Sequence, residues 1–499
     1  MRLDQYLLQE RGVAMLKFLC AQAGAAAILN GMHAAPPAPP PQAPAPAAHA
    51  HTQVQAEDRY PALAHAILKQ FIDTDTTHAK GSSGLAELIA QRATAAGYAS
   101  GDVQVLAPAD HPTKGNVIIR LHGKGLGKPL LANGHLDVVE ANPEDWSTDP
   151  FKLTEKDGYF YGRGTQDMKG DDALMLTEAI RLKQEGFVPD RDIIFAFTAD
   201  EEAGGDANGM KWLLAEHHDL VDAGVSINQD GDGAELKAGK LLFFGVETSE
   251  KLYVTFELET TNRGGHSSVP RADNAIYQMT AALGRLQAFS FPTKTTPTTR
   301  AFFKAYANLQ TGQTKADMLR AAEGDLDPKL VKRLSADPLV NATLHTTCVT
   351  TVISGGQGES ALPERVHATV QCRVMPGETP DEIRATLAKL IDDPGVKISM
   401  DGPIDPSPET TPTPQMLDRY KAAVSGFWPN PLVVPDMQVG ASDSVYTREA
   451  GIPSYVASAL AIDLDDHREH GRDERIRVSA FYRGVAYIDR LMKIMSAKD

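Results

Sequence analysis

The sequence predicts an α/β fold in which a smaller α+β domain is inserted into a main domain with a mixed sheet between helices. Strand-like and helix-like segments alternate from residue 60 to about 247, as they do in layered α/β domains. From 248 to about 400 the strands instead alternate apolar and polar residues. After about residue 400 the α/β pattern of the first segment returns. We therefore expect a main domain at 56–247 and 401–499, an inserted lid at 248–400, and a linker at 1–55.

Single elements follow from these patterns. Ile193 to Phe197 is continuously apolar, which is typical of a central strand covered on both faces. Leu252 to Leu258 alternates strictly and Val366 to Cys372 repeats the alternation, so both are predicted strands of an antiparallel sheet. Thr379 is a predicted helix N-cap, followed by a proline and a capping-box glutamate. Residues 300–345 are expected to form an additional helical insert.

Composition excludes one class of partner. Asp and Glu number 65 against 49 Lys and Arg, and the formal net charge of −16 repels a phosphate backbone. We expect no nucleic-acid partner and no transmembrane segment, because every apolar stretch is too short or interrupted. The three cysteines give neither a disulfide framework nor a metal motif. Cys372 lies on the apolar side of its strand and is predicted to be a buried core thiol.

The N-terminal 55 residues differ from the rest. Residues 15–37 combine a basic residue, a short Ala/Leu-rich core and small residues, which resembles a weak secretory signal. The Pro/Ala-rich run at 35–50 is typical of an extended linker. This predicts a periplasmic or secreted protein. The alternative is a cytoplasmic protein with a disordered leader or a misassigned start codon.

Acidic and imidazole side chains gather where predicted strands end. Open α/β sheets place ligands outside the carboxyl ends of their strands, so these side chains are expected to converge. One further acid lies in a glycine-rich turn between two of the strands. In chain order the residues are His135, Asp137, Asp167 in the turn, Glu201, Glu202, Asp230 and Asp232.

Bringing so many carboxylates together costs several kcal/mol in repulsion and desolvation unless a cation neutralises them. Imidazole and carboxylate ligands without thiolates suit Zn²⁺, with Mn²⁺ or Co²⁺ possible. Two ions that share one carboxylate, typically about 3.5–4 Å apart, would account for the number of acids. Taken singly, each residue is more often a solvated surface group. Their joint occurrence at successive strand ends is what predicts a metal site.

Seven separated motifs resemble, in order, those of the co-catalytic zinc aminoacylase and carboxypeptidase family, metallopeptidase family 20 of clan MH, over roughly residues 60 to 495. The motifs are "GHLDVV", "YGRGTQDMKG", "FTADEEAGG", "TTNRGGHSSVP", "CRVMPGET", "GASDS" and "HREHGRDERIRV". The insert near 300–345 is most similar to the larger, Gly-Xaa carboxypeptidase-like members. The resemblance implies a split zinc-peptidase catalytic domain and a lid that often forms a homodimer, although monomers also occur.

The resemblance also implies two Zn²⁺ per chain, bridged by Asp167. His135 and Asp230 would complete one metal site. Glu202 and His470 would complete the other. The assignment of His470 depends on its H-G-x-x-E spacing, and His467 in the same segment could compete with it.

Catalytic and substrate-binding roles carry over in the same way. Asp137 would hold the imidazole of the first histidine ligand. Glu201 would act as the general base towards a metal-activated water. His266 would reach from the lid, often of a partner subunit, to the oxyanion. Arg373 would bind a substrate carboxylate, a role that suits a guanidinium, with Gly440 lining the same pocket.

Three positions depart from the family pattern or lie outside it. Ser360 stands where many members carry an asparagine, which leaves open whether the usual contact with the substrate amide is made. Asp230, a glutamate in several deacylases and carboxypeptidases, is similar to the dipeptidase-like branch. Asp232 is expected to be a solvated loop acid.

We therefore expect a metal-dependent exopeptidase, dipeptidase- or carboxypeptidase-like, that hydrolyses short peptides with a free terminal carboxylate. An N-acyl-amino-acid amidohydrolase is the alternative, because the same water would attack the same kind of amide. A non-catalytic metal-dependent binding protein is the alternative of another class. Residues 1–55 could also tether the enzyme to another surface.

Overall fold

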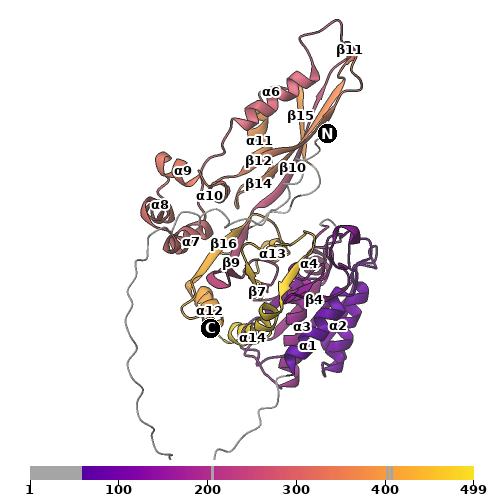
Figure 1. The fold of residues 1–499 in the computed structure, drawn as a ribbon, viewed down its shortest axis with the longest axis vertical. Coiled ribbons are helices and arrows are strands. Elements are labelled where there is room, and N and C mark those ends of the chain that lie inside the picture. Colours follow the sequence, from indigo (N-terminus) through magenta and orange to yellow (C-terminus); the bar gives the residue numbers. More distant parts are fainter. Residues whose placement is uncertain (1–58, 204–206, 401–403, 405–407, 499) are drawn as a thin grey trace, which may run out of the picture.

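The computed structural model describes residues 59–203, 207–400, 404 and 408–498, so the predicted leader and linker lie outside the described residues. Figure 1 shows a broad body around a large sheet and a narrow arm that projects from it. Within the described ranges, no helix combines the length and the apolar character needed to cross a bilayer.

The body contains a ten-stranded mixed sheet in the order β1-β2-β6-β3-β7-β17-β9-β8-β18, with β16 paired to β9. The neighbours β6, β3, β7 and β17 run parallel, so their carboxyl ends lie at one edge. The bounds are β1 Val103–Leu106, β2 Asn116–Leu121, β3 Leu130–His135, β6 Ile193–Thr198, β7 Val225–Asn228, β8 Ala234–Lys237, β9 Lys240–Glu250, β16 Val433–Gln438, β17 Ser454–Val456 and β18 Ala461–Asp463.

Helices cover both faces of this sheet, which explains the continuously apolar strand β6. Phe195 and Phe197 point into one core, whereas Ile194 and Ala196 point into the other. The first core is closed by α1 Tyr60–Ile72, α2 Ser83–Ala95, α3 Lys169–Gln184, α12 Pro414–Val424 and α14 Val478–Met495. The second is closed by α4 Gly209–Glu216, α5 His218–Val221 and α13 Ser444–Glu449. The predicted α/β class with a mixed sheet between helices is confirmed.

A small three-stranded sheet flanks the body and joins two distant parts of the chain. It consists of β4 Thr154–Lys156, β5 Tyr159–Tyr161 and β19 Arg475–Arg477, in the order β19-β5-β4. The pairing of β19 with β5 brings the C-terminal motif beside the glycine-rich turn. Short 3₁₀ turns occur at Ser100–Asp102, Pro143–Asp145 and Ala307–Leu309.

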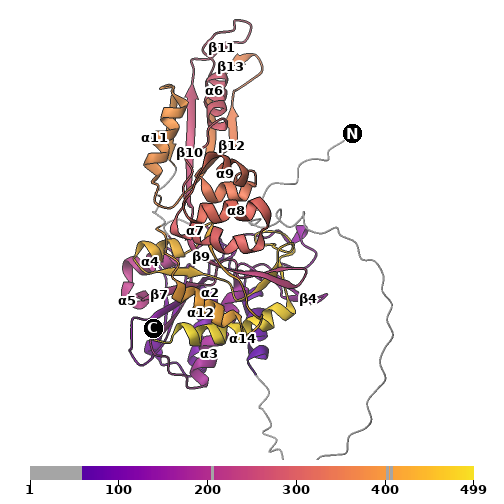
Figure 2. The ribbon, with the colours of Figure 1, turned by 90° about the vertical axis from the view of Figure 1, so that its left-hand side faces the viewer.

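The arm is a four-stranded antiparallel sheet in the order β12-β14-β10-β15, with α6 and α11 packed on one face (Figure 2). The predicted alternation is confirmed, because Val254, Phe256, Val370 and Cys372 are buried in the arm's core. Helix α11 begins with the expected capping box at Thr379. The bounds are β10 Leu252–Thr261, α6 Ala275–Gln287, β12 Thr347–Gly355, β14 Arg365–Val374, α11 Pro380–Ile391 and β15 Val396–Met400, with a two-stranded antiparallel sheet of β11 Gly265–His266 and β13 Ala361–Leu362 at the tip.

The expected helical insert is present and packs on the body. It consists of α7 Pro297–Tyr306, α8 Gly312–Ala322, α9 Pro328–Leu334 and α10 Pro338–Leu344. Phe302 and Phe303 share a core with Phe243 of β9 and Val434 of β16. The insert therefore covers the part of the large sheet from which the arm departs.

The prediction of a free thiol at Cys372 is wrong. The side chain is buried as expected, but it forms a disulfide with Cys348. The antiparallel register of β12 and β14 places the two residues directly opposite each other, with Cα atoms 4.1 Å apart. Sequence spacing gives no signal for this pair, because the register of two strands joined by a long connection is set by tertiary pairing.

Candidate dinuclear metal site

The parallel strands of the body bring the predicted ligands to one edge of the sheet. His135 ends β3, Glu201 and Glu202 follow β6, and Asp230 follows β7. Donor atoms fall within 4.8 Å of one another in two overlapping sets, His135 with Glu201 and Asp230, and His135 with Asp167 and Glu202. We call these five residues together with His470 the first cluster.

Asp167 lies between two imidazoles. Its Oδ1 is 3.0 Å from Nε2 of His135, and its Oδ2 is 3.0 Å from Nε2 of His470. His470 Nε2 is also 2.9 Å from Oε2 of Glu202, and Asp230 Oδ1 is 3.8 Å from Nε2 of His135. One carboxylate with an oxygen towards each histidine has the disposition that a bridging ligand requires.

Glu474 holds the turn that carries Asp167, a role that the sequence analysis missed. Its buried carboxylate accepts hydrogen bonds from the backbone N–H groups of Gly164, Gln166 and Asp167, and from Nη1 of Arg163 at 2.7 Å. Gly164 has φ +90°, a conformation that favours glycine. The sequence does carry a signal for this role, because Glu474 follows His470 at the H-G-x-x-E spacing. That spacing served above only to choose between His470 and His467.

Asp137 makes different contacts from those expected. His135 Nδ1 lies 3.0 Å from the backbone oxygen of Asp137, whereas the nearer carboxylate oxygen is 3.7 Å away. The carboxylate instead accepts from the backbone N–H groups of Glu201 and Glu202, at 3.1 Å each. Asp137 therefore orients the imidazole through its main chain and both glutamates through its side chain.

One member of the first cluster and one residue beside it have left-handed backbone conformations, which cost energy in residues other than glycine. Asp200 has φ +61° and His470 has φ +58°. Asp200 is held by its side chain, which pairs with Lys114 and lies 2.7 Å from Nδ1 of His78. The surrounding contacts thus fix the turn that presents Glu201 and Glu202.

The electrostatics of the first cluster call for a cation. Burial raises the pKa of Glu202 to about 7, and burial with the nearby Asp230 raises that of Glu201 well above its usual value. Hydrogen bonds to Asp167 and Glu202 raise the pKa of His470 to about 11. Without a metal the cluster must therefore retain protons. Its imidazole and carboxylate donors, with no thiolate, fit a pair of divalent ions that would replace those protons.

Arg373 and Gly440 lie next to each other where the arm meets the body. Arg373 Nη1 donates to the backbone oxygen of Val439 at 2.9 Å, and its guanidinium stacks over Tyr253 at 4.6 Å. Within the described residues no carboxylate lies at ion-pair distance from this guanidinium. Lys251 is close enough that burial and the charge of Arg373 lower its pKa to about 7. This corner is positively charged and suits an anionic group.

His266 is not brought to the first cluster within one chain. It lies in β11 at the far end of the arm (Figure 1) and is exposed, with its Nδ1 2.7 Å from the hydroxyl of Ser268. Ser360 lies beside it, because its backbone oxygen accepts from the N–H of Ser267 at 2.9 Å. Both positions belong to the tip, away from the sheet edge that carries the ligands.

Asp232 is a partly exposed loop acid, but it is not an isolated solvated group as expected. It lies with Glu235 and His467 in a second cluster, whose donor atoms are also within 4.8 Å of one another. His467 Nε2 is 3.1 Å from Oε2 of Glu235, and its Nδ1 is 2.9 Å from Oε1 of Glu469. His467 therefore faces this second cluster and does not compete with His470. The loop after β7 therefore places Asp230 in the first cluster and Asp232 in the second.

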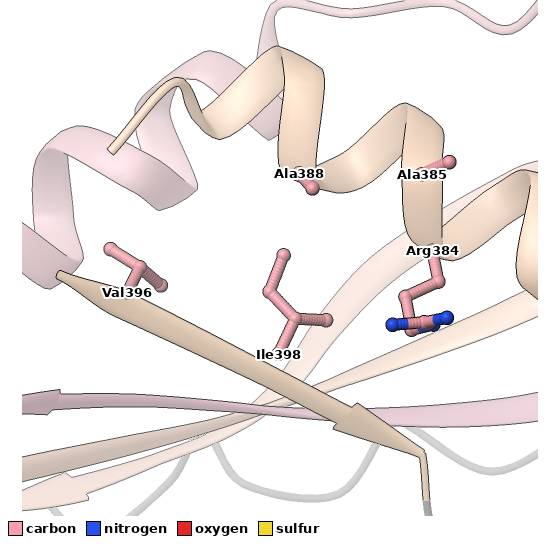
Figure 3. Close-up of a pocket in the computed structure, with 5 residues that line it drawn as sticks. All are labelled: Arg384, Ala385, Ala388, Val396 and Ile398. Atoms are coloured by element: carbon pink, nitrogen blue, oxygen red, sulfur yellow. The ribbon is translucent and has the colours of Figure 1, made fainter. Parts of the chain in front are cut away.

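A pocket of about 260 Å³ on the arm lies apart from both clusters (Figure 3). Figure 3 shows that it is formed between α11 and β15. Its lining consists of alkyl side chains and one guanidinium, namely Arg384, Ala385, Ala388, Val396 and Ile398. It holds neither an imidazole nor a carboxylate and offers no ligand for a metal ion.

A layered α/β body with imidazole and carboxylate ligands converging at its strand ends defines a metal-dependent hydrolase. Residues 131–494 match the profile of peptidase family M20/M25/M40, and the chain belongs to this family. The protein is thus an enzyme of a metallopeptidase family.

Curated relatives and solved structures agree with this assignment. The chain is 28% identical to a probable carboxypeptidase S-like protein 2 of Dictyostelium discoideum, over 73% of this chain and 71% of the relative. It is 28% identical to the N-fatty-acyl-amino acid synthase/hydrolase PM20D1 of Xenopus tropicalis, over 73% and 72%.

Among solved structures, an M20 metallo-carboxypeptidase of Sulfolobus solfataricus superimposes with a TM-score of 0.64 at 17% identity, covering 87% of this chain and 99% of its own. A dinuclear metal binding M20 peptidase of Bacillus subtilis gives a TM-score of 0.56 at 13% identity, covering 87% and 98%. These likenesses confirm the fold.

Proposed function

We propose that this enzyme is an exopeptidase that removes a terminal residue from short peptides with a free carboxylate. The observation that carries the proposal is Arg373, a guanidinium with no carboxylate partner among the described residues, beside the loop that leads to Gly440. A carboxylate of the substrate would supply the missing anion, and charge-assisted hydrogen bonds would fix its orientation. The relationship to a carboxypeptidase S-like protein supports the same substrate class.

We infer two Zn²⁺ per chain at the first cluster, with Mn²⁺ and Co²⁺ as alternatives. Asp167 would bridge them, His135 and Asp230 would complete one site, and Glu202 and His470 the other. When bound, such ions supply Lewis acidity, which polarises an amide carbonyl and lowers the pKa of a water molecule.

The side chains of the protein carry out the remaining steps. Glu201, whose backbone is fixed by Asp137, takes a proton from the attacking water and delivers it to the leaving nitrogen. Arg373 binds the terminal carboxylate and so places the scissile amide. His266 donates to the developing oxyanion when a partner subunit presents the tip of its arm.

This role of His266 requires a homodimer, which we propose to form through the arm. Strand β12 lies at the edge of the arm's sheet and exposes Val349, Val352 and Ile353, which are 60%, 57% and 54% accessible. An exposed apolar edge strand is suited to pairing with a second copy. Light scattering coupled to gel filtration should give about twice the chain mass, and a monomer that is fully active would contradict the proposal.

N-acyl-amino-acid hydrolysis is the second candidate, because the chain is also similar to an N-fatty-acyl-amino acid synthase/hydrolase. The test is amine release from free dipeptides, amidated dipeptides, N-acetyl-amino acids and N-fatty-acyl-amino acids, after loading with zinc or manganese. Turnover of free dipeptides alone supports the exopeptidase. Turnover of acyl substrates alone moves the assignment to a deacylase, and turnover of none contradicts both.

We also propose export from the cytoplasm, supported by the Cys348–Cys372 disulfide, since such bonds persist mainly in oxidising compartments. N-terminal sequencing of protein recovered from periplasm or medium should show a processed chain. An unprocessed chain confined to the cytoplasm would contradict export. An unprocessed chain in the membrane fraction, released on truncation of residues 1–55, would instead favour a tether.

A further inference from the structure

The second cluster lies outside the site proposed for the reaction and is largely buried, with Asp232 partly exposed. Asp232 comes from the loop after β7, Glu235 from β8, and His467 from the loop after β18. The side chains of Glu235 and His467 are only 3% and 6% exposed. Two carboxylates and an imidazole thus meet in a largely buried place with their donor atoms within 4.8 Å of one another.

Two further buried acids lie against this cluster. Glu247 of β9 and Asp436 of β16 are register partners and are 1% and 6% exposed. Asp232 is the charged residue that acts most strongly on each of them. Within the described residues, no lysine or arginine lies at ion-pair distance from any of these acids. The surroundings are therefore rich in carboxyl groups, with His467 as the nearest cationic partner.

Glu247 provides an independent sign that a ligand is missing. One of its oxygens accepts from the backbone N–H of Asp232 at 3.1 Å and from Nε2 of Gln438 at 3.0 Å. The other oxygen, Oε2, is buried without a hydrogen-bond partner among the described residues. A buried carboxylate oxygen without a donor is unfavourable, whereas a nearby cation or a ligand water of that cation would satisfy it.

The orientation of His467 matches that of a metal ligand. One ring nitrogen, Nδ1, is held by Glu469 at 2.9 Å, and the other faces Glu235 at 3.1 Å. His135 in the first cluster has the same arrangement, with Nδ1 held at 3.0 Å by a backbone oxygen and Nε2 facing Asp167 at 3.0 Å. An imidazole held through one nitrogen presents the other to a metal ion.

We propose that Asp232, Glu235 and His467 bind a third divalent metal ion, of the Zn²⁺ or Mn²⁺ type, next to the dinuclear site. Two carboxylates and one imidazole form a donor set that suits either ion. Glu247 and Asp436 would lie next to these three ligands without being counted among them.

The position of this ion gives it a role in ordering the first cluster. Asp230 and Asp232 flank Gly231, and a Cβ at Gly231 would lie 2.5 Å from Oε1 of Glu247, so this loop packs directly on the acids. His467 and His470 belong to one further loop. The third ion therefore fixes two loops, each of which also supplies a ligand to the first cluster. It is a positioning site and makes no contact with substrate.

The test is the metal stoichiometry of the full chain after loading with zinc or with manganese and removal of free ions, measured by mass spectrometry of the elements. The wild type should retain three ions, and the variant Glu235→Gln with His467→Gln should retain two. The variant His135→Gln with His470→Gln should retain one. Asp465→Asn, an exposed acid in the loop of His467, is the matched control and should retain three.

Loss of the third ion should also weaken binding at the first cluster by about tenfold, because outer ligands typically contribute 10- to 100-fold to metal affinity. Crystals of the wild type should show anomalous density between Asp232 and His467 at the zinc or manganese edge. If the variant Glu235→Gln with His467→Gln does not fold, the anomalous density of the wild type still tests the proposal. Equal stoichiometry in the wild type and in Glu235→Gln with His467→Gln, or no anomalous peak, would overturn the proposal and leave His467 as the proton-carrying partner of Glu235 and Glu469.

Discussion

At the scale of single residues, the predicted metal site depends on carboxylates that hold the backbone as much as on those that face a ligand. Asp137 binds the N–H groups of Glu201 and Glu202, and its main chain orients His135. Because two adjacent glutamates are anchored at their backbones, their side chains can take separate directions. This separation is what allows Glu202 to lie beside His470 while Glu201 faces His135 and Asp230.

Replacement of Glu201 by glutamine should lower kcat by about 10²- to 10⁴-fold, because an amide cannot accept the proton of the attacking water. Metal content and melting temperature should stay unchanged, since the backbone contact with Asp137 remains. Steady-state kinetics and elemental analysis provide the measurements. Glu216→Gln, an exposed position in α4, is the control. A variant that keeps its activity would refute Glu201 as the base.

Arg373→Lys should reduce kcat/KM for substrates with a free carboxylate by about 10- to 100-fold, the usual contribution of a hydrogen bond to a charged group. A lysine cannot reproduce the planar fork of the guanidinium. Amidated peptides, which lack the carboxylate, should be hydrolysed equally slowly by both proteins. If the variant loses as much activity towards amidated peptides, Arg373 has a structural role and does not bind the substrate.

At the scale of elements, loops at the ends of the parallel strands are held by buried contacts from distant segments. The turn with Asp167 is fixed by Glu474, which lies 307 residues later in the chain. The carboxylate of Glu474 accepts hydrogen bonds from backbone N–H groups of the turn and from Arg163. The pairing of β19 with β5 places Glu474 there. Such contacts keep the predicted metal ligands in place before any ion is bound.

Glu474→Gln should destabilise the fold by about 3–5 kcal/mol, because it leaves the buried charge of Arg163 without its partner. Urea unfolding followed by circular dichroism measures this change, and metal affinity should fall as the turn loosens. Asp381→Asn, which removes an exposed ion pair with Arg384, should leave the free energy of unfolding unchanged. Equal stability of wild type and Glu474→Gln would contradict the role assigned to this carboxylate.

The disulfide in the arm should stabilise the pairing of β12 with β14. Its cysteines are separated by 24 residues, for which loop-closure entropy corresponds to about 3 kcal/mol. Cys348→Ala with Cys372→Ala should lower the melting temperature of the arm, and differential scanning calorimetry can measure the shift. Wild type treated with reductant should shift in the same direction. An unchanged melting temperature in both cases would show that the arm does not depend on the bond.

At the scale of the whole molecule, stability should depend on metal and pH together. Burial raises the pKa of Glu202 to about 7 and that of Asp436 to about 8, so the metal-free fold prefers both groups protonated. The stability that these two protonated groups contribute to the fold is fully present below their pKa values in the unfolded chain, near 4. It is lost as pH rises through their pKa values in the folded protein, about 7 and about 8. A bound metal instead requires the ionised carboxylates and becomes more favourable with rising pH.

The increase in melting temperature on adding zinc to chelator-treated protein should therefore grow between pH 5 and pH 8. Differential scanning fluorimetry at constant ionic strength measures it directly. A nucleotide or calcium added in place of zinc serves as the control ligand. An increase that is constant or that shrinks with rising pH would contradict the assignment of these raised pKa values.

Much of the fold could be predicted because it depends on local periodicity. The continuous run in β6 and the alternation in β10 and β14 are properties of neighbouring residues, so the two sheets follow from them. The start of helix α11 was also predictable, because Thr379 and Glu382 form its capping box and stand at the spacing that this motif requires. In the candidate site, the strand-end positions of His135 and Asp230 gave a comparable signal, since topology rules place ligands at these ends.

The sequence by itself determined the fold class, the family and the set of residues gathered as the first cluster, because each depends on short motifs in a fixed order. Only the tertiary structure decided which atom of Asp137 contacts which neighbour and that Cys348 and Cys372 form a disulfide. It also decided that Asp232 and His467 belong to a second cluster and not to the first. These features depend on strand register and on loops that meet from distant parts of the chain. Such long-range distances leave no local pattern in the sequence from which they could be read.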